Sequence, residues 1–357
     1  MPDSLLKDFC GYVSDHATSA GLSHTITANE GSAIAMAAGY HLGTGKLPLV
    51  YMQNSGLGNA VNPLLSLADP KVYATPMVLL IGWRGEPGKK DEPQHIVQGA
   101  RMAAMLAAMD IPFEILPDYI EGATDVVDTL CHTARARSCP VALLVKRQTF
   151  EPYKMKYAVT SEAPLTREDS LSLCLSKLSE WDAVVSTTGF ASREVFELRE
   201  ALGQGHERDF LTVGSMGHAS AIALGIAEAK PSKSVFCFDG DGATIMQMGN
   251  MATVGMSGAK NFKHVINNNL AHDSVGAQPT GAEVLDLPAV ARALGYTWSA
   301  YADTEAEVNE KFAELQAHAD GPGLLEIRVR PGARDDLGRP TSSPVENKEA
   351  FMEFLKQ

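Results

Sequence analysis

Short apolar runs that end in polar or glycine-rich residues recur along the chain. They lie at 47–52, 77–82, 141–145, 183–186, 234–238, 264–266 and 324–329. Uninterrupted apolar runs of this length are typical of strands that are buried on both faces of a parallel sheet. Segments of small or helix-periodic residues at 32–40, 218–229 and 243–257 predict helices.

The length of the chain and the position of one irregular stretch predict its division into domains. A chain of 357 residues is long enough for two domains of about 150–180 residues each. Residues 151–166 include two prolines and show little periodicity, so we interpret them as a linker between domains 1–150 and 167–357. Because both halves combine strands, small-residue helices and polar loops, we expect an α/β fold with two doubly wound parallel sheets.

Two polar turns in the second half follow neighbouring predicted strands. Asp241 lies in a GDG turn after strand 234–238, and Asn268 lies in an NNN turn after strand 264–266. A right-handed strand–helix–strand unit would bring both turns to one edge of the sheet, where such sheets bind ligands. A carboxylate and an amide oxygen suit Mg²⁺, and the two glycines would let a phosphate approach closely. A short glycine motif alone also fits a simple turn, whereas the correctly spaced pair is more specific.

Polar residues after the strands of the first half are also candidates for ligand contacts. Glu30 precedes a helix of small residues, where an acid is also favoured by the helix dipole alone. Gly56 lies in a polar turn directly after strand 47–52. Arg84 and His95 lie in a loop dense in charge, which is either solvated or supplies positive charge to an anionic substrate.

Other candidates have an equally plain structural alternative. Thr188 and Gly189 precede a predicted helix, where they form either an anion-binding turn or a simple cap. Met216 is a residue type that usually fills gaps in a core. Near the N-terminus, Asp3 or Ser4 would cap a first helix.

Composition and charge exclude several classes of protein. A net charge of −13 argues against nucleic-acid binding, and an anionic substrate would need local cations or a metal. No apolar run approaches the roughly 18 residues of a membrane span, and the N-terminus does not resemble a signal peptide. Five cysteines without metal-type spacing predict reduced core thiols in a cytoplasmic protein.

The GDG turn followed by NN at this distance resembles the magnesium and diphosphate signature of thiamine-diphosphate enzymes. The resemblance implies that Mg²⁺ is bound by Asp241, by Asn268 and by the backbone carbonyl of Leu270. It implies that Glu30 bonds N1′ of the cofactor's aminopyrimidine and promotes its imino tautomer. The carbonyl of Gly214 would accept from the 4′-amine, while Met216 would wedge between the two rings. The remaining cofactor contacts would be Gly56, Thr188, Gly189, Gly240, Gly242 and Ala243.

Longer stretches narrow the resemblance within that family. The sequences ITANEG, YMQNSGLGN, GWRGEPGKKDEPQH and NNNLAHDSVGAQPT resemble decarboxylases of 2-keto acids that carry a second anion, a phosphonate or a sulfonate. The KDEPQH stretch favours the phosphonate. This implies a carboxy-lyase with His95 and His272 as catalytic candidates; a lone histidine is more often structural. Substrate contacts would come from Asp3, Ser4, Arg84 and Gln278.

The resemblance also implies an assembly. The first domain would hold the pyrimidine and the second the diphosphate, and the chain has no room for the middle domain of many relatives. Members usually carry a helix and a strand before residue 1, so the start is misplaced, the chain is trimmed, or that strand is missing. The minimum unit would be a homodimer in which Glu30 and Asp241 of one site belong to different subunits.

Two other classes of protein compete with this interpretation. A nucleotide-binding dehydrogenase would also place a glycine turn after a strand, but the chain has no G-x-G-x-x-G with a trailing ribose-binding acid. A non-catalytic cofactor-binding subunit would account for the short N-terminus, although the presence of Glu30 argues against it.

Overall fold

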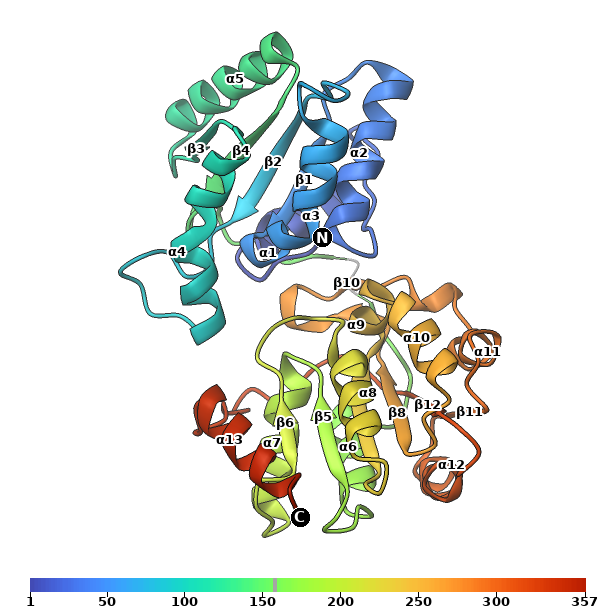
Figure 1. Ribbon diagram of the computed structural model, residues 1–357. Coiled ribbons are helices and arrows are strands. Elements are labelled where there is room, and N and C mark those ends of the chain that lie inside the picture. Colours follow the sequence, from blue (N-terminus) through green and yellow to red (C-terminus); the bar gives the residue numbers. More distant parts are fainter. Residues whose placement is uncertain (157–158) are drawn as a thin grey trace. The chain divides into compact units, whose positions relative to one another are not determined.

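The computed structural model describes residues 1–156 and 159–357. The chain folds into two compact units, Met1–Ala158 and Val159–Gln357, and each is described by itself (Figure 1). Residues 157 and 158 belong to the expected linker 151–166 and lie outside the described residues.

A four-stranded parallel sheet in the order β1-β2-β4-β3 forms the centre of the first unit. Its strands are β1 (Leu49–Gln53), β2 (Met77–Gly82), β3 (Phe113–Ile115) and β4 (Pro140–Val145). The helices are α1 (Lys7–His16), α2 (Glu30–Thr44), α3 (Leu57–Pro63), α4 (Pro93–Ala108) and α5 (Ile120–Arg137). Because alternate residues point to opposite faces, Met52 packs against α2, α3 and α4, whereas Tyr51 packs against α1 and α5.

A six-stranded parallel sheet in the order β11-β12-β8-β7-β5-β6 forms the centre of the second unit. Its strands are β5 (Ala183–Ser186), β6 (Asp209–Leu211), β7 (Val235–Gly240), β8 (Phe262–Asn268), β11 (Trp298–Ala302) and β12 (Gly323–Arg328). Two-residue strands β9 (Ala271–His272) and β10 (Gln278–Pro279) form a separate antiparallel pair.

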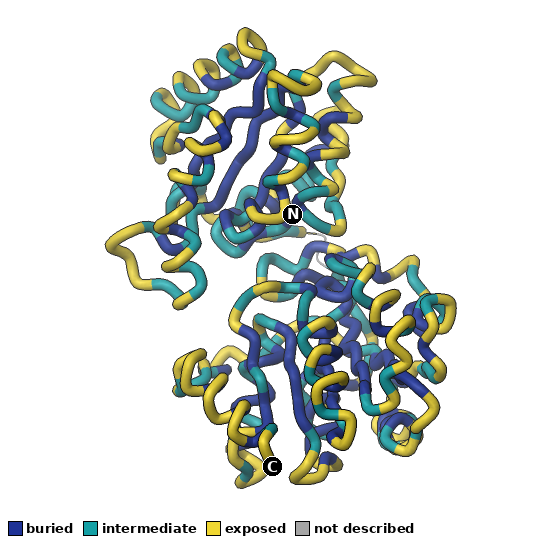
Figure 2. The backbone as a smooth tube through the Cα atoms, in the orientation of Figure 1, coloured by how far each residue is buried: buried dark blue, intermediate teal, exposed yellow. Residues whose placement is uncertain are grey.

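Helices cover both faces of this second sheet, so its strands are buried (Figure 2). One face packs against α6 (Arg167–Leu175), α7 (Phe190–Ala201) and α12 (Glu305–Ala317). The other packs against α8 (Ala219–Ala229), α10 (Gly249–Ser257), α11 (Leu287–Ala293) and α13 (Pro344–Phe354). The expected fold class, two doubly wound α/β domains without a middle domain, is confirmed.

Two expectations about helices are wrong. The helix expected over 243–257 is two helices, α9 (Asp241–Met246) and α10, separated at Gln247 and Met248. The break lets the side chain of Gln247 pack beside Gly217, where a Cβ atom would lie 2.7 Å from its Cγ. Helix α1 begins at Lys7 without a side-chain cap, so neither Asp3 nor Ser4 caps it.

Other findings concern the membrane and the cysteines. No helix in the described ranges has both the length and the apolar character that a membrane span requires. All five cysteines are free thiols, four of them buried, as expected for reduced core cysteines.

Candidate functional site

The carboxyl ends of β5, β7 and β8 lie side by side in the second unit. From β5 the chain first adds β6 on one side and then β7 on the other, so the strand order reverses at β5. Strand β7 pairs with β8 so that Gly240 lies opposite Asn267. Asp241, the first residue of α9, therefore follows β7 beside Asn268, the last residue of β8. Open α/β sheets bind ligands at such a switch point.

Asp241 is a buried carboxylate with one side-chain partner. The hydroxyl of Thr280 donates to Oδ2 of Asp241 at 2.5 Å. Burial raises the pKa of Asp241 to about 6, although hydrogen bonds from Thr280 and from backbone amides oppose the shift. A buried carboxylate of this kind is stabilised in its charged form by a bound cation.

Asn268 and Leu270 are held in a fixed turn after β8. The Nδ2 atom of Asn268 donates to Oε1 of buried Glu326 at 2.7 Å, and its Oδ1 accepts from the amide of Leu270 at 3.1 Å. Leu270 has φ +64°, an uncommon conformation for a residue with a side chain. Its carbonyl accepts from the amide of Thr280 and keeps a second lone pair. Asn268 and Leu270 therefore share one hydrogen-bonded turn, and Thr280 links this turn to Asp241.

Buried polar atoms without a hydrogen-bond partner among the described residues gather around this turn. They are the hydroxyls of Thr187 and Thr244 and the side-chain amides of Asn267 and Gln278. Such orphans are rare in native proteins and indicate a missing ion, ligand or water. A diphosphate and a divalent cation would supply acceptors to the hydroxyls and amides and a positive charge to Asp241. The residues present therefore fit a magnesium–diphosphate group.

The starts of α7 and of α9, which begins in the GDG turn, have backbone amides without a side-chain cap. Gly189 has φ +90° and precedes α7, whose first amides receive no side-chain cap. The anion-binding alternative for Thr188 and Gly189 is consistent with this geometry. At Gly242 an added Cβ would lie 3.1 Å from the ring of His272, so a glycine permits the close packing of the turn. Gly240 and Ala243 lie on either side, at the end of β7 and within α9.

His272 and Gln278 face each other across the β9–β10 pair. Burial lowers the pKa of His272 to about 4, so its imidazole is neutral at pH 7. Gly214 and Met216 lie on the loop between β6 and α8, and both are half-buried. The same loop packs against the first turn of α10, because Asn250 donates to the carbonyl of Gly217 at 3.0 Å.

Glu30 is a buried acid at the start of α2 in the first unit. Its Oε2 accepts from Nδ2 of Asn59 at 2.8 Å. The helix is capped by Asn29, whose side chain accepts from the amide of Ser32, so Glu30 is not needed as a cap. Gly56 leaves the space that Glu30 occupies, since a Cβ there would lie 2.3 Å from Oε1.

Asp3, Ser4 and Arg84 lie together at the carboxyl ends of β1 and β2. Arg84 donates to Oγ of Ser4 at 2.7 Å, and Gln53 donates to Oδ1 of Asp3 at 2.5 Å. Burial raises the pKa of Asp3. A cavity of about 790 Å³ beside them is lined by Ser4, Arg84 and ten other residues, among them Lys7 and Arg147.

One cation of the loop after β2, Arg84, is neutralised within the first unit. Arg84 pairs with both oxygens of Asp91 at 2.5 and 2.9 Å, and Arg147 pairs with the same carboxylate at 3.1 Å. His95 lies in the first turn of α4, half-buried, and its backbone packs on Gly85. Arg84 is thus a positioned donor rather than a free cation.

Several residues that support the site could not be assigned from the sequence. Asn59, Thr280 and Glu326 each contact a predicted site residue but come from other parts of the chain. Glu326 carried the clearest signal, because it is a lone acid in the apolar run of β12. Buried charges of this kind need a partner.

Two family models match the chain. Residues 1–105 match the model described as "Thiamine pyrophosphate enzyme, N-terminal TPP binding domain". Residues 195–327 match "Thiamine pyrophosphate enzyme, C-terminal TPP binding domain". Together with the fold and the site, these two matches identify the chain as a thiamine pyrophosphate enzyme.

Curated relatives show which group of thiamine pyrophosphate enzymes the chain resembles. Phosphonopyruvate decarboxylase of Streptomyces viridochromogenes is 37% identical over 96% of this chain and 87% of its own length. The enzyme of that name from Streptomyces hygroscopicus is 36% identical over 97% and 86%. Sulfopyruvate decarboxylase of Methanosarcina acetivorans is 26% identical over 99% and 92%. The chain belongs to the thiamine pyrophosphate-dependent 2-keto acid decarboxylases, in the family that contains phosphonopyruvate decarboxylase.

Proposed function

We propose that the protein converts 3-phosphonopyruvate to phosphonoacetaldehyde and CO₂ in phosphonate biosynthesis, with thiamine diphosphate and Mg²⁺. The observation that carries the proposal is the 37% sequence identity to the phosphonopyruvate decarboxylase of Streptomyces viridochromogenes over 96% of the chain. The orphaned polar atoms around Asp241 and the space reserved for Glu30 support the same cofactor.

Each unit would hold one part of the cofactor. In the second unit, Asp241, Asn268 and the carbonyl of Leu270 would bind Mg²⁺. The diphosphate would contact Thr188, Gly189 and the GDG helix, whose contributing residues are Gly240, Gly242 and Ala243. Gly214 and Met216 would contact the aminopyrimidine and the ring junction. In the first unit, Gly56 and Glu30 would complete the pyrimidine site.

The residues of the chain would orient the substrate and manage protons. When bound, thiamine diphosphate supplies a carbanion that adds to the ketone and accepts the electron pair released with CO₂. Glu30 would hold a proton at N1′ of the aminopyrimidine. A proton must replace CO₂ on the former ketone carbon, and His95 and His272 are the candidates to guide it. Asp3, Ser4, Arg84 and Gln278 would contact the substrate, with Arg84 donating to the phosphonate.

We infer a homodimer with shared active sites as the functional unit. Helix α2, which begins at Glu30, exposes Met36, Tyr40 and Leu42. An added Cβ at Gly39 or Gly43 would meet no atom within 4 Å. An apolar helix face with small residues lets a second subunit approach closely, and obligate interfaces are of this kind.

Sulfopyruvate decarboxylation is the second candidate, because a sulfopyruvate decarboxylase is similar over nearly the whole chain. The two substrates differ in the charge of the terminal anion, and Arg84 already shares its charge with Asp91. A non-catalytic cofactor-binding subunit is a third possibility, which the buried position of Glu30 disfavours.

One assay separates these candidates. Purified protein is incubated with Mg²⁺, thiamine diphosphate and either phosphonopyruvate or sulfopyruvate, and aldehyde production is measured. We expect aldehyde mainly from phosphonopyruvate and none from a Glu30→Gln variant. Preference for sulfopyruvate would overturn the substrate but retain the cofactor site, and full activity of Glu30→Gln would overturn the assignment of the proton site.

A further inference from the structure

A single carboxylate oxygen joins three separate segments beside the metal turn. Oδ2 of Asp273 accepts from Nη1 of Arg167 at 3.3 Å and from the amide of Gly332 at 2.8 Å. It also accepts from Nδ2 of Asn269 at 3.4 Å. Asp273 begins a short 3-10 turn (Asp273–Val275) directly after β9, whereas Arg167 begins α6 and Gly332 follows β12.

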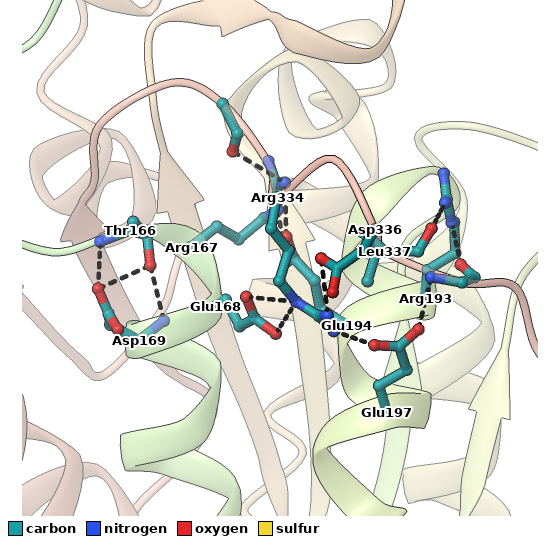
Figure 3. Close-up of polar contacts among 12 residues, drawn as sticks. Thr166, Arg167, Glu168, Asp169, Arg193, Glu194, Glu197, Arg334, Asp336 and Leu337 are labelled. Atoms are coloured by element: carbon teal, nitrogen blue, oxygen red, sulfur yellow. Dashed lines mark hydrogen bonds and ion pairs between the residues drawn. The ribbon is translucent and has the colours of Figure 1, made fainter.

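Two residues of α7, Glu194 and Phe190, hold the side chain of Arg167 in place. It is buried and makes a bidentate pair with Glu194, at 2.7 and 2.8 Å (Figure 3). Its guanidinium also lies over the ring of Phe190, 5.2 Å from the ring centroid. Phe190 is the first residue of α7 and directly follows Thr188 and Gly189. Arg167 is therefore anchored to the helix whose start we assign to the diphosphate.

Asp273, the second partner of Arg167, lies at the metal turn, as its neighbours Asn269 and Ser274 show. Asn269 directly follows the expected ligand Asn268, and its side-chain amide reaches Asp273. Oγ of Ser274, the residue after Asp273, lies 3.9 Å from the position of a Cβ atom on Gly189. The segment that carries two of the three expected metal ligands, Asn268 and Leu270, thus lies against the expected diphosphate turn, and Arg167 and Asp273 join the two.

We propose that Arg167 and Asp273 are positioning residues that set the spacing between the metal turn, residues 268–273, and the start of α7. A magnesium–diphosphate group spans both, so a shift between them would weaken its binding. The outer partners of metal ligands affect affinity in this way. Loss of Arg167 would also leave the buried carboxylate of Glu194 without its bidentate partner, whereas loss of Asp273 leaves Arg167 paired with Glu194. The proposal rests on the proposed cofactor site.

The same region supplies a matched control. Arg334 holds the C-terminal segment onto α6 and α7 through Glu168 and Glu197, and it also pairs with Asp336 of the same segment (Figure 3). Its side chain is 36% exposed, and none of the hydrogen bonds described for it reaches the metal turn. Loss of Arg334 therefore loosens the same segment without disturbing the link between Asp273 and Asn269.

The test measures cofactor binding directly. Thiamine diphosphate is titrated at saturating Mg²⁺, and Mg²⁺ at fixed cofactor, by calorimetry on the whole protein and on variants Asp273→Asn, Arg167→Gln and Arg334→Gln. We expect both Kd values to rise at least about tenfold in the first two variants and to stay within about twofold in Arg334→Gln. Arg167→Lys, which keeps the charge, should recover part of the affinity. The double variant should be no weaker than the worse single variant, because the residues act as a pair.

Two results would overturn the proposal. One is a lowered Tm in Asp273→Asn with unchanged Kd values, which describes a purely structural pair. The other is an equal loss in Arg334→Gln, which would assign the effect to the C-terminal segment. If Asp273→Asn does not fold, Arg167→Lys against Arg334→Gln gives the same comparison. Asp241→Ala separates this proposal from the cofactor site, because cofactor binding by Asp241→Ala at wild-type affinity would reject the site itself.

Discussion

Glu30 and Gly56 show how closely single residues constrain the first unit. The two are far apart in sequence, yet Gly56 is a glycine because the carboxylate of Glu30 fills the space of its missing side chain. Asn59, on the next turn, donates to the same carboxylate. Glu30, the acid that we assign to the aminopyrimidine, is thus held in place by burial, by the hydrogen bond from Asn59 and by the space that Gly56 leaves.

Substitution of Gly56 should therefore act through Glu30. In Gly56→Ala the new Cβ would lie 2.3 Å from Oε1, so the carboxylate must move. Displacement of a reacting group by about 1 Å can cost about 100-fold in rate, and we expect a loss of kcat/KM of at least this size. Gly58→Ala is the matched control, because a Cβ at Gly58 meets no atom within 4 Å. Equal aldehyde production by both variants would contradict the role of Gly56.

Glu326 should act in the same indirect way on the metal. Glu326→Leu removes the acceptor that orients Asn268, and we expect Mg²⁺ affinity to fall about tenfold. Glu326→Gln keeps a carbonyl acceptor and should bind Mg²⁺ nearly as the wild type does. Calorimetric titration of Mg²⁺ in the presence of cofactor distinguishes the variants, and identical affinities would show that Asn268 needs no such support.

For single residues, the sequence predicts the metal ligands better than it predicts the residues that hydrogen-bond to those ligands. Asp241 and Asn268 could be proposed from spacing, because both follow apolar strands. Glu326 and Thr280 contact them only after β12 and the segment following β10 have packed beside β8. No local pattern encodes such contacts, since they arise from the order of the strands.

Among the elements, the strands inside the sheets and the edge strand β1 were predictable, whereas the edge strands β3 and β11 were not. β2 and β5 have the predicted ends because their runs are buried on both faces. β3 and β11 lie at sheet edges, and their mixed residues are mostly half-buried or exposed, so they resemble loops. The break between α9 and α10 was missed because the apolar periodicity continues across it, and only packing against Gly217 shows it.

Strand β6 is also an edge strand, and a side chain of α13 hydrogen-bonds to its free backbone edge. Asn347 of α13 donates to the carbonyl of Asp209 at 2.7 Å and accepts from the amide of Leu211 at 3.1 Å. Its side-chain amide thus takes the place of a neighbouring strand. Figure 1 shows α13 beside β6, and Phe351 and Phe354 bury its apolar face in the core.

Removal of this amide should destabilise the second unit. Asn347→Leu leaves one buried donor and one buried acceptor unpaired, which we expect to cost about 2–4 kcal/mol. Asn347→Asp keeps the acceptor for Leu211 but places a buried carboxylate against the carbonyl of Asp209, so it should also be destabilising. Lys348→Leu changes a side chain that is 51% exposed and should change the free energy of unfolding by less than about 0.5 kcal/mol. Urea unfolding compares the three, and equal midpoints would reject the role of Asn347.

For the whole molecule, the proposed division of the cofactor site between the two units makes assembly the central question. If α2 contacts a second subunit, a charge on its exposed face should block association. Gly39→Arg should shift the mass measured by light scattering from twice 38.1 kDa to 38.1 kDa and abolish decarboxylation. Ala136→Arg on α5, a helix that packs on the other face of the sheet, should leave the mass and the activity unchanged. A dimeric Gly39→Arg variant would place the interface elsewhere.

Complementation between two inactive variants tests whether the active sites are shared. We expect Glu30→Gln and Asp241→Ala to be inactive alone, since one lacks the proton site and the other a metal ligand. In a mixed dimer with shared sites, one site would carry both substitutions and the other neither. Random association makes half the dimers mixed, so co-expressed variants should recover about a quarter of the wild-type activity. Sites built from a single chain would recover none, because every site would then carry one of the two substitutions.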